Sequence, residues 1–392
     1  MPKREPNSLF ASVPLPTAAL APAETLACLR LIRSENVGPV TFRELINHYG
    51  GAALALEALP ELSRRGGRAR QIRICPRDAA EAELEAAAKA GATPVFTIEP
   101  GYPPALAEVD APPPLLYIKG QADLLSRHAV AIVGSRLCSA AGAKLAGLFA
   151  HAISEAGYTI VSGFARGIDG AAHEASLARG TVAVLAGGID IIYPPEHDKL
   201  YARLAIEGCL VTEQPPGFKP RGQDFPRRNR IISGMSRGVV IVEAAARSGT
   251  LVTARFAGEQ GREVFAVPGH PLDPRAEGTN KLIKSGATLV TCPEDVLEAL
   301  RPICGLEDAG SRVPWARGPE TGLSSVPDPV RNAGTLERDL VTTALGPAPV
   351  DLDALVRATG LPLRTVRIAL VELDLAGRIT RPGPGLLALK LA

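Results

Sequence analysis

The sequence is poor in aromatic residues and has almost no excess of either charge. Phe, Trp and Tyr make up 4% of its 392 residues, and 43 Lys and Arg face 41 Asp and Glu, for a net charge of +2. This balance excludes a uniformly basic coat for nucleic acid, although near-neutral totals can hide segregated charge. Lys is also scarce, since the 43 basic residues are 34 Arg and 9 Lys. Arg holds phosphate with a planar fork that Lys lacks.

Long apolar runs and paired cysteines are also missing. No stretch approaches the roughly 18 apolar residues that a membrane span needs, and Pro14, Pro16 and Pro22 interrupt the N-terminal apolar stretch, which argues against a signal peptide. The six cysteines include no CxxC pair. We therefore expect reduced thiols in the cytoplasm, no disulfide framework and no metal site.

Composition divides the chain into five segments. A Pro- and Ala-rich start predicts a disordered tail, and helical periodicity follows it, with a turn at Gly38-Pro39 between two short helices. A stretch rich in Gly, Pro and Ser predicts a linker, which contains the only Trp, Trp315. The last residues predict three helices and a hairpin, a winged-helix outline. The predicted segments are a tail at 1–22, a helical domain at 23–92, an α/β domain at 93–304, a linker at 305–334 and a winged-helix domain at 335–392.

The α/β domain is indicated by short apolar, β-branched runs that alternate with segments of helix length. Such alternation predicts right-handed crossovers and a doubly wound, mostly parallel sheet whose strands are buried on both faces. The expected strands are Val130–Val133, Thr159–Ser162, Val182–Ala186, Leu210–Thr212, Val239–Glu243, Val264–Val267 and Leu289–Thr291.

Glycine-rich turns follow several of these strands. The carboxyl ends of parallel strands meet at one edge of a sheet, where backbone N–H groups at helix starts attract anions. The pattern GxGxxG of dinucleotide-binding proteins is absent, and Arg136 stands where those proteins keep Gly. We expect no bound cofactor, and this motif alone fits either a phosphate clamp or a plain strand–helix turn. The candidate residues in the first three turns are Gly134, Ser135, Arg136, Ser162, Gly163, Arg166, Gly167, Asp169, Gly187 and Gly188.

The densest positive charge lies between Lys219 and Arg237, with six cations against the single anion Asp224. Phe225 stands inside this run. Cations on phosphates and a ring that stacks on a base are what single-stranded nucleic acid requires. The candidate residues here are Phe225, Arg227, Arg228, Asn229 and Arg230.

A fourth anion-friendly turn contains Ser248, Gly249 and Thr250. No GxSxG pattern supports Ser248 as a nucleophile, and we expect no catalytic residue. His173 is interpreted as a helix-packing histidine. A second cationic run, Arg64–Arg77, fits either a solvated helix face or a further nucleic-acid surface.

Together these motifs resemble the DNA processing protein A (DprA/Smf) family. The resemblance rests on Val133-Gly134-Ser135-Arg136, the Ser162–Asp169 run, Tyr193-Pro194, the Phe225–Gly234 run, Ser248-Gly249-Thr250 and the Val264–Gly269 run. It implies an extended Rossmann domain that binds single-stranded DNA, forms homodimers and loads the recombinase RecA during natural transformation. The N-terminal region resembles a SAM-like or helix–hairpin–helix domain.

By this resemblance, Arg136, Gly163, Arg166 and the Arg227–Arg230 segment line a phosphate-binding pocket. Members often have Lys at the position of Arg227, and an Asn at the position of His197. Arg227 keeps the positive charge of the family's pattern, whereas His197 departs from that pattern.

Two other functions remain open from the residues. The sheet also resembles that of lysine-decarboxylase-like enzymes, which cleave nucleoside monophosphates and carry PGGxGTxxE. Here Thr253 stands where that pattern has its Glu, which argues against hydrolysis. A transcription regulator that uses the winged helix is disfavoured by the near-balanced charge from Gly334 onward, seven cations against six anions. Protein docking and DNA binding are equally compatible with that domain.

Overall fold

The computed structural model describes residues 19–308, 332–383 and 385–390, which form two compact units. One unit is formed within Glu83–Arg312, and the other combines Met1–Ala82 with Val313–Ala392. Most of the predicted tail and linker, including Trp315, lies outside the described residues. The last helix of the first unit continues to Asp308. The domain boundaries stay a prediction.

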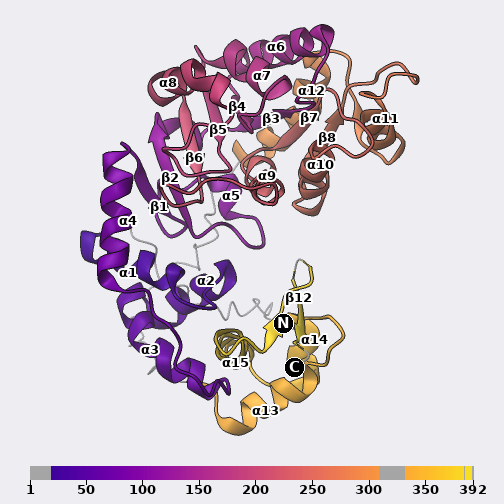
Figure 1. Cartoon of the computed structure of the whole chain (residues 1–392). Coiled ribbons are helices and arrows are strands. Elements are labelled where there is room, and N and C mark those ends of the chain that lie inside the picture. The colour runs from indigo at the N-terminus through magenta and orange to yellow at the C-terminus, as the bar shows by residue number, and fades with distance from the viewer. Residues whose placement is uncertain (1–18, 309–331, 384, 391–392) are drawn as a thin grey trace, which may run out of the picture. The chain divides into compact units, whose positions relative to one another are not determined.

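A nine-stranded sheet forms the centre of the Glu83–Arg312 unit (Figure 1). Its strand order is β1-β2-β6-β5-β4-β3-β7-β8-β9. All neighbours from β6 to β9 pair in parallel, while β1 and β2 join the β6 edge antiparallel. The predicted doubly wound, mostly parallel sheet is confirmed. Its strands are β1 (Thr93–Phe96), β2 (Leu115–Gly120), β3 (Ala129–Val133), β4 (Thr159–Ser162), β5 (Thr181–Val184), β6 (Cys209–Thr212), β7 (Gly238–Ile241), β8 (Glu263–Ala266) and β9 (Thr288–Leu289).

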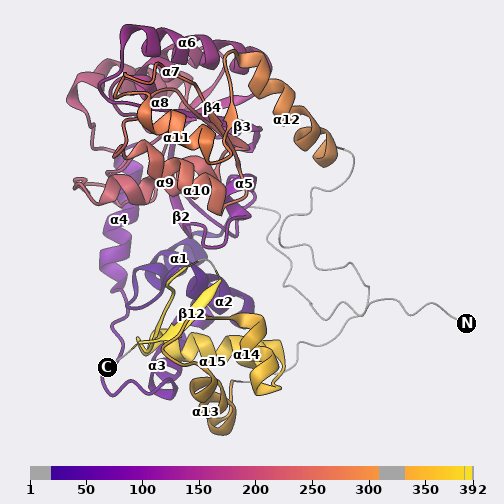
Figure 2. The same ribbon diagram turned by 90° about the vertical axis from the view of Figure 1, so that its right-hand side faces the viewer.

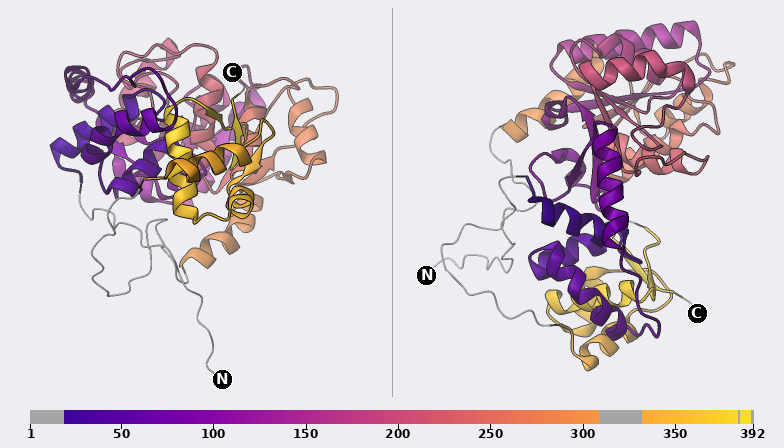
Figure 3. Two further views of the ribbon diagram at one scale, coloured as in Figure 1. Left: turned by 90° about the horizontal axis from the view of Figure 1, so that it is seen from below. Right: turned by 60° about the vertical axis from the view of Figure 1, so that its left-hand side comes forward.

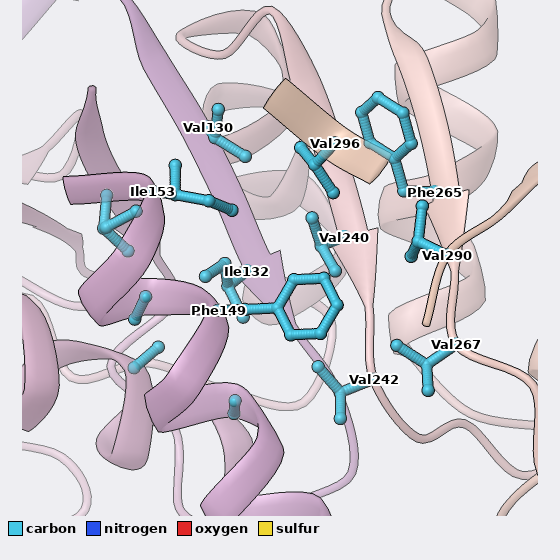
Figure 4. Packing of buried hydrophobic residues seen from close by; sticks show 14 of the residues in the cluster. Val130, Ile132, Phe149, Ile153, Val240, Val242, Phe265, Val267, Val290 and Val296 are labelled. Atoms are coloured by element: carbon cyan, nitrogen blue, oxygen red, sulfur yellow. The ribbon is translucent and has the colours of Figure 1, made fainter. Parts of the chain in front are cut away.

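Helices cover both faces of this sheet (Figures 2 and 3). On one face, Phe149 and Ile153 pack on Val130 and Ile132 in a fully buried cluster that continues to Val296 (Figure 4). The helices are α4 (Arg77–Lys89, which crosses the boundary of the unit), α5 (Pro104–Ala107), η1 (Ala122–Ser126), α6 (Ala140–Glu155), α7 (Ile168–Ser176), η2 (Pro195–His197), α8 (Asp198–Glu207), α9 (Asp224–Gly234), α10 (Thr250–Glu259), α11 (Glu277–Lys284) and α12 (Pro293–Asp308).

Strand direction explains where sequence-based prediction failed. The strand β2 was missed, because strand–helix alternation marks parallel crossovers, and β2 pairs antiparallel and leads through only η1 to β3. The predicted strands Val182–Ala186 and Val239–Glu243 each end two residues earlier than expected. The residues beyond those ends belong to turns at the edge where the loops gather.

The second unit contains the N-terminal helices and the winged helix. Pro39 begins one helix, which confirms the predicted Gly-Pro turn. Gly50, with φ of 76°, ends that helix. The winged-helix outline is confirmed, with one short strand, β10, that was not expected. The elements are α1 (Pro22–Arg33), α2 (Pro39–Tyr49), α3 (Ala52–Arg65), α13 (Thr335–Ala344), β10 (Val350–Asp351), α14 (Leu352–Thr359), α15 (Leu363–Leu375), β11 (Ile379–Thr380) and β12 (Leu386–Leu389).

Arginines of the cationic run Arg64–Arg77 meet acidic partners. Arg68 pairs with Glu35 at 2.7 Å, and Arg77 pairs with Glu81 one helical turn away at 2.7 Å. Arg77, at 72% exposure, fits the solvated-face interpretation, whereas Arg68, at 16%, is largely buried. In the part of the chain that the structure describes, every helix is too short or too polar to cross a membrane.

Candidate functional site

A pocket of about 260 Å³ opens beyond the carboxyl ends of β3, β4 and β5. Three arginines line it and no acidic residue does, so its lining carries a positive charge. The predicted turns after these strands therefore converge as expected. The lining residues are Arg136, Leu137, Gly163, Phe164, Ala165, Arg166, Leu185, Ala186, Gly187, Ile191, Tyr193, Pro194, Pro220, Phe225 and Arg228.

An arginine and two rings meet at the pocket. The guanidinium carbon of Arg136 lies 4.8 Å from the ring centre of Phe225, within cation–π range. The Tyr193 ring lies 5.4 Å from that of Phe225 at 53°. Tyr193 is about half exposed, so it presents a ring to an incoming ligand. This cluster can contact a phosphate and a flat base from neighbouring positions.

Arg166 supplies a second accessible cation. Its side chain is 54% exposed and pairs with Glu196, which is 58% exposed. The arginine lowers the pKa of Glu196, after a larger contribution from a backbone hydrogen bond within that residue. Exposed ion pairs contribute little free energy. A phosphate can therefore take the place of Glu196 at small cost.

Arg228 is a cation of a different kind, because it is 5% exposed. Its guanidinium donates to the carbonyl oxygens of Gly163, at 2.5 Å, and Val184. The Asp169 carboxylate accepts N–H bonds from Gly163 at 3.1 Å and Ala165 at 3.2 Å. Burial raises the pKa of Asp169, which the charge of Arg228 opposes. Arg228 and Asp169 thus fix the loop after β4, and Arg228 also lines the pocket.

An aromatic layer lies beneath the loop after β4. Phe164, with φ of 57°, packs its ring 5.1 Å from His197 and 6.3 Å from His173. His173 is fully buried, and its Nδ1 lies 2.8 Å from the Thr181 hydroxyl. Burial lowers the pKa of His173 to about 3. The histidine is therefore neutral and belongs to helix packing.

The sheet's strand order reverses at β3, between β4 and β7, and doubly wound sheets bind phosphates at such a point. Here Glu243 fills the start of α6. Its carboxylate accepts the Ser139 N–H at 3.0 Å and the Ser139 hydroxyl at 2.6 Å. A Cβ at Gly142 would lie 2.5 Å from its Oε1. The chain's own carboxylate thus takes the place of a phosphate, and the pocket lies to one side over β3, β4 and β5.

The basic segment divides into exposed and internal cations. Arg227 is exposed on α9 and forms no ion pair with another described residue. Arg230 instead pairs with Glu213 at 2.5 Å and donates to the Ala111 carbonyl at 3.3 Å. Asn229 is 9% exposed and donates to the Gly249 carbonyl at 3.3 Å. Only part of this segment is therefore free to meet a ligand.

The remaining candidates hold the turns together. The Thr250 hydroxyl donates to the Gly134 carbonyl at 2.9 Å, and the Ser248 hydroxyl donates to Thr250 Oγ1 at 3.0 Å. Ser162 is buried and donates to the Ile132 carbonyl at 2.6 Å. The pocket lining does not include Gly134, Ser162, Ser248 or Thr250. It also does not include the other candidates Ser135, Gly167, Asp169, Gly188, Arg227, Asn229, Arg230 and Gly249.

Comparison with family profiles covers three parts of the chain. Residues 93–301 match DNA recombination-mediator protein A, residues 22–86 match the DprA-like N-terminal HHH domain, and residues 326–383 match the DprA winged helix domain. The first match alone spans more than half of the chain and contains the whole pocket. The chain belongs to the DNA recombination-mediator protein A family.

Individual relatives agree with this assignment. Protein Smf of Escherichia coli is 43% identical over 74% of this chain and 76% of its own length. The crystal structure of DNA processing protein A from Streptococcus pneumoniae is 34% identical, covers 70% of this chain and 96% of its own, and has a TM-score of 0.59. The structure of the Helicobacter pylori protein, described by its single-stranded DNA binding mode, is 29% identical over 51% of this chain and 93% of its own, with a TM-score of 0.48.

Within this DNA-processing family member, two site features escaped prediction from sequence. Tyr193 was recognised as part of a motif but not as a ring beside Phe225, because the two residues are far apart in the chain. The sequence pattern placed Glu243 in a strand, but the strand ends at Ile241. An acidic residue at the end of a buried apolar run is a signal for a turn whose carboxylate accepts hydrogen bonds, as Glu243 does from Ser139.

Proposed function

We propose that the pocket over β3, β4 and β5 binds single-stranded DNA. The observation that carries the proposal is the cluster of Arg136, Phe225 and Tyr193 in a pocket without acidic lining. Arginine forks bind phosphates, and rings stack on bases that are not paired. Membership of a DNA recombination-mediator family supports the same ligand.

Single strands fit this geometry better than a duplex does. In a duplex the base faces are stacked on one another and cannot reach a ring inside a pocket. A single strand exposes a base face to Phe225 or Tyr193 while its phosphates contact Arg136 and Arg166. Arg227, exposed on the neighbouring helix α9, extends the positive surface beyond the pocket.

The same geometry supports a binding role without catalysis. Thr253 is 2% exposed, within α10, and Ser248 donates its hydroxyl to Thr250. Neither residue is placed as an acid or a nucleophile facing the pocket. The proposal therefore treats the lysine-decarboxylase-like reaction as the disfavoured alternative.

The family resemblance extends the proposal to partners. We propose that the chain acts as a homodimer that protects incoming single strands and transfers them to the recombinase RecA. A recombinase-loading assay on single strands coated with a single-strand-binding protein tests this extension. Strand exchange that this protein fails to accelerate would refute it while leaving DNA binding intact.

The pocket itself is tested by two substitutions and one control. Arg136→Ala and Phe225→Ala are expected to weaken binding of a short oligothymidylate by about tenfold each, because Arg136→Ala removes a phosphate contact and one base stacked on Phe225 is worth about 1–3 kcal/mol. Arg203→Ala is the control, since this exposed arginine on α8 pairs with Glu174 outside the pocket. Fluorescence anisotropy measures the affinities. If Arg136→Ala and Phe225→Ala bind as tightly as the Arg203→Ala control, the proposal is refuted.

A further inference from the structure

The third helix of the winged helix is buried on two sides. The side of α15 within its own domain packs on α13 and α14, and another side packs on α2 and α3 of the N-terminal helices (Figures 1 and 2). Eight of its thirteen residues are buried, among them Val366, Leu370 and Leu373. A winged helix that reads duplex DNA presents this helix to the groove, whereas here the chain's own helices cover it.

A buried carboxylate joins the two domains at this contact. Glu372 on α15 is fully buried and lies between Arg338 of α13, at 2.5 Å, and Arg65 of α3, at 3.1 Å. Burial raises the pKa of Glu372, and the charge and hydrogen bond of Arg338 oppose this shift. A buried carboxylate needs its cations, so separating α3 from α15 removes one of the two.

Further polar contacts surround Glu372. Thr41 donates its hydroxyl to Asp374 at 2.6 Å, and the Asn36 side chain donates to the Leu375 carbonyl at 3.0 Å. Arg378 donates to the Gly66 carbonyl at 3.3 Å. These hydrogen bonds connect specific side chains of one domain to side-chain and backbone acceptors of the other, as in a specific interface.

One of the two arginines at the start of α15, where a DNA-reading helix contacts the groove, faces the N-terminal helices instead. Arg364 and Arg367 lie at the start of α15, and Arg367 approaches Glu44 of α2 at 3.8 Å. The domain also carries almost no net charge from Gly334 onward, with seven cations and six anions. Phosphate contacts dominate duplex affinity, and this domain offers few.

We infer that the winged helix of this chain is a protein-docking module whose partner is the chain's own N-terminal helical domain. Its third helix is an interface helix and not a DNA-reading helix. The two domains form one structural unit although more than two hundred residues separate them in sequence. This inference does not depend on the pocket or its ligand.

Gly66 provides a direct test of the contact. A Cβ at this position would clash with the backbone carbonyl of Glu372, while its φ of −67° suits any residue. Gly38→Ala is the matched control, because a Cβ there meets nothing within 4 Å. In the full chain, Gly66→Ala is expected to speed amide hydrogen exchange of residues 366–375 at least tenfold over Gly38→Ala. Exchange rates within twofold of each other would overturn the inference.

Gly66 ends α3, so a set of charge swaps covers the case in which Gly66→Ala also loosens that helix. Glu44→Arg and Arg367→Glu are each expected to speed exchange in residues 366–375 about threefold, and the double variant is expected to restore the wild-type rate. A double variant that exchanges faster than both single variants would overturn the inference.

Two further measurements distinguish other partners. Light scattering is expected to give the same mass for Gly66→Ala and wild type, because the contact lies within one chain, and a lower mass would show a second copy as the partner instead. Duplex affinity is expected to change less than twofold in Arg364→Ala. A tenfold loss would show that α15 reads DNA and would overturn the inference.

Discussion

Arg227 and Arg228 are neighbours in the sequence but have opposite environments. Arg227 is exposed on α9, whereas Arg228 is 5% exposed and holds the carbonyls of Gly163 and Val184. Arg228→Met is expected to lower the free energy of unfolding by about 3–5 kcal/mol, because it leaves the Asp169 carboxylate buried without its cation. Arg227→Ala is expected to leave stability within about 0.5 kcal/mol and to weaken single-strand binding. Urea unfolding and anisotropy measure the pair, and equal stability losses would contradict this division.

His173 gives stability a defined dependence on pH. Its pKa of about 3 in the folded chain lies below the ordinary value of 6.5, so the unfolded state binds the proton first. Stability is therefore lost as the pH falls from 6.5 toward 3, by at most about 1.4 kcal/mol per unit. His173→Asn is expected to flatten this limb, and His151→Asn, at an exposed position, is expected to leave it unchanged. If the free energy of unfolding falls equally steeply below pH 6.5 in wild type and in His173→Asn, the histidine is not the cause of the pH dependence.

At the residue scale, the sequence indicates which residues gather at the site better than it indicates what each side chain contacts. The basic run and its ring were recognisable, and Arg136, Arg166 and Phe225 do line one pocket. The sequence does not distinguish a cation that faces solvent from one that binds backbone carbonyls, because that depends on which side of α9 meets the sheet. Arg228 and Arg230 show the difference, since both are bound to the chain's own acceptors.

The start of α6 is stabilised by the carboxylate of Glu243, in the turn that follows β7. Glu243→Gln is expected to lower the free energy of unfolding by about 1 kcal/mol, because it removes a negative charge at a helix N-terminus and weakens the bonds from Ser139. Glu259→Gln is the control, since its pair with Arg255 is exposed. Thermal unfolding measures both, with single-strand affinity expected to stay unchanged. A larger loss in the control would contradict the role of Glu243.

Elements that follow a regular rule were predictable, and those that break it were not. The parallel strands were visible as apolar runs because both of their faces are buried, as in Val130–Val133. The antiparallel strand β2 lies outside the strand–helix rhythm, and the short strand β10 pairs only two residues with β12. A two-residue strand leaves no periodicity to detect.

At the scale of the molecule, the pocket belongs to one compact unit, and both flanking domains belong to the other. The reversal point of the sheet is closed by Glu243, so the positive pocket lies over β3, β4 and β5. The contact between the winged helix and the N-terminal helices was not predictable from sequence. It depends on Glu372 and Arg65, which are about three hundred residues apart and share no motif.

The central claim is that Arg136 and Arg166 bind phosphates of a single strand. The most direct test is the salt dependence of oligothymidylate affinity for wild type and for the double variant Arg136→Ala/Arg166→Ala. Each phosphate contact on a single strand contributes about 0.7 to the slope of log affinity against log salt. The double variant is expected to reduce the slope by about 1.4 together with the affinity. An unchanged slope and affinity would contradict the claim.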